Sequence, residues 1–103
     1  MLETEKPKTE KEKLLHFELG ETVATPGALE ELEKANVSPL RLLGRHQSGD
    51  WGDICEDDRK ENELSLKEGF RLLSAYKLET GAKIWVITEA DRSVTTLLLP
   101  SEY

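Results

Sequence analysis

The chain has 103 residues, of which 37% are hydrophobic and 34% charged, and its formal net charge is −7. This length allows one domain with a single core, and no apolar run approaches the roughly 18 residues that a membrane helix needs. The acidity disfavours broad affinity for a nucleic-acid backbone, which depends on lysine and arginine, but it leaves room for a small site that handles one phosphate.

The N-terminal residues differ in composition from the rest. Residues 1–13 contain four lysines, four glutamates and one apolar side chain after Met1. Such a segment cannot bury enough surface to fold, which predicts a disordered charged tail before a single domain over 14–103. The single cysteine, Cys55, cannot form an internal disulfide, and no secretory apolar stretch follows Met1, so we expect a cytoplasmic protein.

The first half of the domain is predicted to contain a strand and two helices. Residues 14–25 alternate well enough for a strand, with Gly20 as a bulge or turn. Helix signals follow over 26–35, with Thr25 as N-cap and Asn36 at the C-terminal end, and they recur over 39–46 after Ser38. In the second helix we expect Leu40, Leu43 and His46 on one side.

The second half is predicted to contain a third helix and three strands. Asp57 or Asp58 can cap the helix, which Gly69 ends. Three runs, 70–78, 83–88 and 94–100, are rich in β-branched and aromatic residues and are separated by turn compositions, which predicts a meander. The fold class is therefore α+β: an N-terminal strand and two to three short helices packed on a curled antiparallel sheet. The neighbour of the first strand in this sheet stays open.

Two motifs resemble a known family. The stretch "RHQSGDWGDICEDD", with Asn62 after it, and the stretch "WVITEADRSVTTLLLP" are similar to those of short proteins encoded on bacterial plasmids and other mobile elements. The similarity covers residues 17–103. It implies an accessory protein of such an element and supplies no activity.

A second, topological resemblance concerns catalysis. The order of strand, helices and antiparallel strands is similar to that of small metal-independent ribonucleases of the barnase, colicin and RelE-like group. That resemblance implies catalytic roles for His46, Arg92 and Thr95 or Thr96, and RNA as the substrate. The residue types suit the chemistry, since histidine exchanges protons near neutral pH and arginine binds two phosphate oxygens.

A non-catalytic interpretation uses the same region. Trp51, between Gly49 and Gly52, is either an anchor for a partner's pocket or a plug that fixes a loop to the core. Each polar candidate also has a structural interpretation; Asp91, for example, can bond to its own backbone in a tight turn. The candidate binding residues are Arg45, Ser48, Asp50, Trp51, Asn62 and Asp91.

Other chemistry is disfavoured. His46 and Asp50 have a helical ligand spacing, but Gly49 and Gly52 interrupt the helix that it needs, so no metal or cofactor is predicted. The acids after Cys55 disfavour a reactive thiolate. Three hypotheses result: a non-catalytic interaction module with a protein partner, a ribonuclease as the alternative, and an acidic decoy that mimics nucleic acid.

Overall fold

A computed structural model describes residues 16–103, so the predicted tail over 1–13 lies outside the described residues. The elements follow in the order β1 (Glu21–Ala24), α2 (Pro26–Ala35), α3 (Pro39–Gln47), α4 (Glu56–Glu68), β2 (Leu72–Lys77), β3 (Lys83–Thr88), β4 (Val94–Leu98) and a short 3₁₀ turn, η1 (Pro100–Glu102). The predicted α+β class, with an N-terminal strand before the helices and a C-terminal meander, is confirmed.

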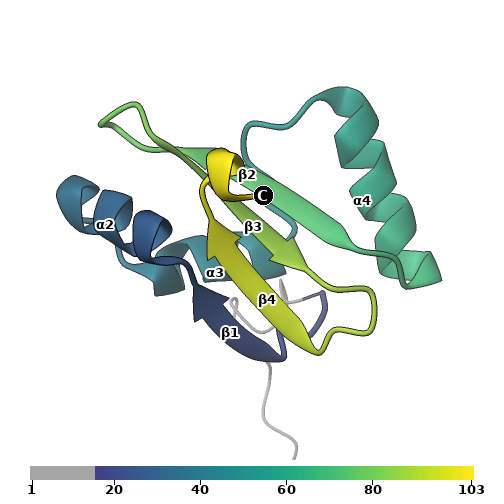
Figure 1. Cartoon of the computed structure of the whole chain (residues 1–103). Coiled ribbons are helices and arrows are strands. Elements are labelled where there is room, and N and C mark those ends of the chain that lie inside the picture. Colours follow the sequence, from purple (N-terminus) through teal and green to yellow (C-terminus); the bar gives the residue numbers. More distant parts are fainter. Residues whose placement is uncertain (1–15) are drawn as a thin grey trace, which may run out of the picture.

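The four strands form one sheet in the order β1-β4-β3-β2 (Figure 1). Strands β2, β3 and β4 make the predicted antiparallel meander. Strand β1 lies parallel to β4, with Glu21 opposite Val94 and Ala24 opposite Leu97. This pairing settles the position of the first strand and makes the sheet mixed instead of wholly antiparallel. It also leaves β1 and β2 as the two edges.

Capping residues next to the helices explain most of the helix boundaries. The Thr25 hydroxyl accepts a hydrogen bond from the Ala28 amide, Asn36 is left-handed with φ 57°, and the Ser38 hydroxyl accepts from the Leu40 amide. These predicted caps are confirmed, as is the end of α4 at Gly69. The first strand is shorter than predicted, because Gly20 turns with φ +68° and regular pairing begins only at Glu21.

The start of the third helix differs from the prediction. Helix α4 begins at Glu56, with Cys55 in the N-cap position and no side-chain cap, so the prediction that Asp57 or Asp58 caps it is wrong. Both aspartates lie inside the first turn. Their carboxylates still favour the helix there, through attraction to the positive end of its dipole.

Helices α2 and α3 supply the helical part of the core on one face of the sheet. In Figure 1, α3 lies behind the strands, and α4 runs beside β2. The core on the covered face includes Leu32, Leu42, Tyr76, Val86 and Leu97. Leu40 does not join it as predicted: its side chain is 76% exposed, while Leu43 and His46 are buried. None of the helices within residues 16–103 is long and apolar enough to cross a membrane.

Candidate functional site

His46, the predicted catalytic base, is completely buried in the last turn of α3. Its Nδ1 lies 2.5 Å from the Ser74 hydroxyl and its Nε2 lies 2.9 Å from the Thr88 hydroxyl. Burial, together with the positive charge of Arg92, lowers the pKa of His46 to about 3. The imidazole is therefore neutral at physiological pH, and both of its nitrogens are already bonded.

The hydroxyl groups around His46 form a directed chain. The Thr95 hydroxyl donates to the Leu19 carbonyl oxygen at 2.7 Å, and the Thr88 and Thr95 hydroxyls lie 2.7 Å apart. Since Thr95 has given its proton to the carbonyl, Thr88 must donate to Thr95 and accept from His46 Nε2. Nδ1 then accepts from Ser74. The chain thus fixes the Nε2–H tautomer of His46.

Arg92, the predicted phosphate ligand, occupies the turn between β3 and β4 with φ 61°. Its guanidinium donates hydrogen bonds to four backbone carbonyl oxygens, those of Ser65, Phe70, Glu89 and Ala90. It also lies 5.7 Å from the centre of the Phe17 ring, whose edge-on contact with His46 has a centre distance of 5.2 Å. Arg92 and His46 thus meet around Phe17, but Arg92 ties the end of α4 to the turn.

The four predicted catalytic residues do not come together in one site. His46 and Thr95 are buried in one network, while Thr96, the next residue on β4, projects to the opposite face of the sheet. Because His46 is buried and neutral and the Arg92 donors are bonded to carbonyls, this geometry offers no free base and cation to a phosphate. The ribonuclease role remains a prediction that the geometry does not favour.

Trp51, the candidate partner anchor, has no exposed surface. Its ring stacks on Phe17 with centres 6.2 Å apart, meets His46 edge-on at 5.7 Å, and its indole N–H donates to Glu63 at 3.0 Å. This residue is the plug that fixes the loop between α3 and α4 to the core, and it presents nothing to a partner.

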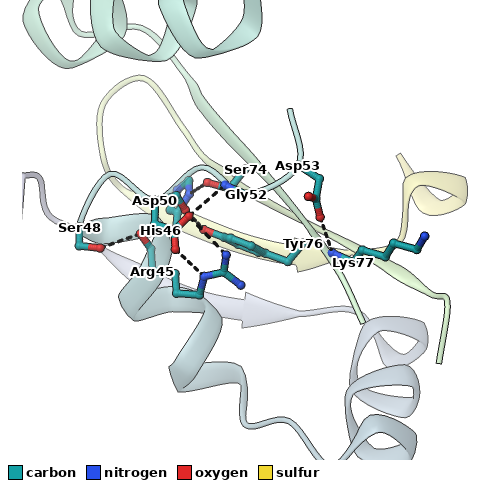
Figure 2. Close-up of polar contacts among 9 residues, drawn as sticks. All are labelled: Arg45, His46, Ser48, Asp50, Gly52, Asp53, Ser74, Tyr76 and Lys77. Atoms are coloured by element: carbon teal, nitrogen blue, oxygen red, sulfur yellow. Dashed lines mark hydrogen bonds and ion pairs between the residues drawn. The ribbon is translucent and has the colours of Figure 1, made fainter. Parts of the chain in front are cut away.

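The loop that Trp51 anchors covers the β2 edge of the sheet. The Trp51 carbonyl accepts from the Ala75 amide, and the Asp53 amide donates to the Ala75 carbonyl. The Asp53 carboxylate accepts from the Lys77 amide, a contact that Figure 2 shows. Gly52 lies so close that a Cβ there would overlap the Ala75 carbonyl oxygen. The backbone of the loop therefore pairs with β2 like a short additional strand.

Asn62 completes this cover from α4. Its side-chain amide donates to the Leu73 carbonyl at 2.7 Å and its oxygen accepts from the Leu73 amide at 3.1 Å. Together with the loop, this buried residue satisfies the outward amides of β2 at Leu73, Ala75 and Lys77. The role of Asn62 in the structure is to close the edge of the sheet.

Three further candidates make local contacts. Arg45 binds Asp50 through two nitrogen–oxygen pairs, at 2.7 and 3.3 Å, and this ion pair lowers the pKa of Asp50 (Figure 2). The Ser48 hydroxyl donates to the Arg45 carbonyl at the end of α3. Asp91 is exposed and accepts from the Ser93 amide, so the predicted tight turn is confirmed.

The other edge of the sheet, β1, is a candidate site that the sequence analysis does not predict. The Glu21 amide donates to the Ser93 carbonyl and the Thr25 amide to the Leu97 carbonyl, so the backbone groups of the alternate residues Thr22 and Ala24 point away from β4. Within residues 16–103 these outward groups have no hydrogen-bond partner. The sequence carries no direct signal of this edge, because which strands are edges depends on long-range pairing.

An apolar groove of about 390 Å³ borders β1. It lies between β1, α2 and α3 and is lined mainly by apolar residues: Val23, Ala24, Leu29, Pro39, Leu40, Leu43 and Leu97, together with Thr22 and Ser38. Three of these are large hydrophobic residues with exposed side chains: Val23 at 41%, Leu29 at 47% and Leu40 at 76%. The free edge and the apolar surface thus lie side by side.

Comparisons with protein-family models, with curated proteins and with solved structures found no match. Among residues 16–103, no three histidine, cysteine or acidic side chains come together in a way that would hold a metal ion. The function is therefore inferred from the geometry of the two edges.

Proposed function

We propose that this protein is a non-catalytic interaction module that binds an extended segment of a partner protein along β1. We further propose that it is an accessory or regulatory protein encoded on a bacterial plasmid or other mobile element. Only the resemblance of its two sequence motifs supports this part of the proposal. The alternative ribonuclease function gains no support from His46 and Arg92, whose polar groups are used inside the fold.

The observation that carries this proposal is the contrast between the two sheet edges. Natural proteins block sheet edges that must not pair, and here Asn62 and the loop over 51–53 block β2. The outward groups of Thr22 and Ala24 on β1 have no such cover from the described residues. A bare edge accepts an added strand through main-chain hydrogen bonds, while pockets beside it select side chains.

The apolar groove supplies these pockets. Because Leu29 and Leu40 project from two different helices toward the same groove as β1, an added strand would contact both while it pairs with Thr22 and Ala24. Exposed apolar surface next to a free edge marks an interaction site, since water contact with these side chains is unfavourable. The side chains facing the groove should therefore be apolar.

Charge indicates the kind of partner. Residues 1–13 are neutral overall, so the remaining residues carry the whole net charge of −7. Exposed carboxylates flank the groove: Glu21 begins β1, and Glu33 follows Leu29 by one turn on the same side of α2. We therefore propose a net-basic extended segment with apolar side chains at alternate positions. A second copy of this chain would add another seven negative charges and is disfavoured.

Selection of peptides from a random displayed library tests this proposal. Selected peptides should be net-basic with alternating apolar residues, and Leu40→Lys should weaken their binding about tenfold, because it places a charge in the groove. Leu64→Lys is the matched control: Leu64 is 45% exposed on α4, away from β1, and its replacement should leave binding unchanged.

Three outcomes would contradict the proposal. The first is a library that yields no such peptides, and the second is a set of peptides whose binding is insensitive to Leu40→Lys. The third is a dimer in sedimentation that Leu40→Lys dissociates, because the edge would then be occupied by a second copy.

A further inference from the structure

A second groove, of about 440 Å³, lies on a different side of α3. It is formed by the end of α2, the Arg41–Arg45 stretch of α3 and the end of β2. Its volume is in the range of small-molecule sites, which span roughly 300 to 1,000 Å³. It is separate from the β1 groove, because Leu40 and Leu43 line that groove and Arg41, Leu42 and Arg45 line this one.

The second groove is basic although the protein is acidic. Three cationic residues line it, Arg41, Arg45 and Lys77, with Glu79 as the one lining residue that carries a carboxylate. Arg41 and Arg45 are one turn apart on α3, and like charges at this spacing destabilise a helix. Asp50 compensates Arg45 only; within residues 16–103, Arg41 makes no ion pair.

The Arg45 side chain is held in place by Asp50 and Tyr76. Its Nε and Nη2 atoms bond Asp50, and its guanidinium carbon lies 4.5 Å from the centre of the Tyr76 ring. The Tyr76 hydroxyl in turn donates to the Asp50 carbonyl at 2.6 Å. Figure 2 shows this arrangement, with the guanidinium beside the aromatic ring and the Lys77 ammonium extending away from it. The Nη1 group of Arg45 has no partner among the described residues, so it remains available to a ligand.

We propose that this groove binds the phosphate group of a small phosphomonoester, with Arg41 and Arg45 Nη1 as the direct donors. Arginine matches phosphate because its planar group forms paired, charge-assisted hydrogen bonds. The three cations of the lining face Glu79 and the Asp50 carboxylate that pairs with Arg45, so the groove keeps one positive charge in excess. This local excess favours a small anion, and a phosphomonoester, which is nearly dianionic at neutral pH, gains more from it than a monoanion does. A long polyanion is disfavoured by the overall charge of −7, so the ligand is one phosphate group on a small molecule.

Titration of the protein with phenyl phosphate at constant ionic strength, followed by NMR, tests the proposal. The Nε–H signals of Arg41 and Arg45 should shift on binding. Arg41→Gln should weaken binding about tenfold, since it removes one charge-assisted contact and leaves the Arg45–Asp50 pair intact. The control is Lys67→Gln, at an exposed position on α4, which should leave the affinity unchanged.

A charge series distinguishes this site from nonspecific attraction. Affinity should rise between pH 5 and pH 7 as the phosphate loses its second proton near pH 6. Phenyl sulfate, which stays monoanionic, should bind more weakly than phenyl phosphate. The absence of binding at millimolar concentrations, equal affinity for the sulfate, or equal losses in Arg41→Gln and Lys67→Gln would each overturn the proposal.

Discussion

The imidazole of His46 and the hydroxyl of Thr88 form a 2.9 Å hydrogen bond in the interior, across 42 residues of sequence. With Ser74 on the other nitrogen, this bond makes His46 a fixed part of the core. The residue with the best chemistry for proton transfer thus joins α3 to two strands of the sheet, and His46 accordingly gives the fold a pH dependence.

The stability of the protein should fall below pH 6.5 because of His46. Its pKa is about 3 in the folded protein and near 6.5 in the unfolded chain, so the unfolded chain binds the extra proton between these values. The contribution of His46 is fully present above pH 6.5 and decreases as pH falls, by about 1 kcal/mol per unit. Urea unfolding at pH 7, 6 and 5.5 measures this change before the carboxylates titrate.

The NMR signals of the His46 imidazole measure its protonation state independently of the stability of the protein. His46 should remain the neutral Nε2–H tautomer at pH 5. A His46 signal that titrates with a midpoint near 6.5 in the folded protein would contradict the closed hydroxyl chain.

Replacement of Arg92 should destabilise the fold. Arg92→Lys keeps the charge and the positive φ but loses most of the four hydrogen bonds to carbonyl oxygens, which should reduce the free energy of unfolding by about 2 kcal/mol or more. Arg59→Lys, in an exposed ion pair with Glu56, is the control and should change stability by less than about 1 kcal/mol. Equal stability of the Arg92→Lys protein and the original would remove the structural role assigned to Arg92.

Two glycines should respond to alanine in opposite directions. At Gly52, with φ +77°, a methyl group meets the Ala75 carbonyl, so Gly52→Ala should cost about 3 kcal/mol and loosen the cover over β2. At Gly44, inside α3, no atom lies within 4 Å of the added methyl, so Gly44→Ala should stabilise the protein by about 0.5 to 1 kcal/mol. The denaturant midpoints of the two variants test both predictions: the midpoint should fall for Gly52→Ala and rise for Gly44→Ala. A stable Gly52→Ala protein would show that the loop does not pair closely with β2.

Local signals predicted much of the fold. The cap residues Thr25, Asn36 and Ser38 bond their own neighbours, so the limits of α2 and the start of α3 follow from adjacent positions. The three later strands follow from β-rich runs between turns. The sequence does not determine the pairing of β1 with β4, because this pairing joins residues more than 70 positions apart and depends on how the helices pack.

The candidate site was harder to predict for the same reason. Within the stretch 45–58, residues 51–53 cover an edge of the sheet, His46 joins the core and the acids from Glu56 begin α4. Whether Trp51 is a plug or an anchor depends on Phe17 and Glu63, and whether His46 is free depends on Ser74 and Thr88, 28 and 42 residues away. The residue types show which chemistry a side chain could perform. Whether it can perform that chemistry depends on its burial, and burial depends on long-range packing.

Amide hydrogen exchange along the two sheet edges tests the proposed interaction function most directly. In the free protein, the amides of Thr22 and Ala24 should exchange rapidly, while those of Leu73 and Ala75 are protected by their partners. At a peptide concentration that slows exchange at Thr22 and Ala24 about tenfold in the original protein, exchange in Leu40→Lys should slow only about twofold, because its affinity is about tenfold lower. Protection of Thr22 and Ala24 in the free protein, or peptide binding that leaves their exchange unaltered, would contradict the account.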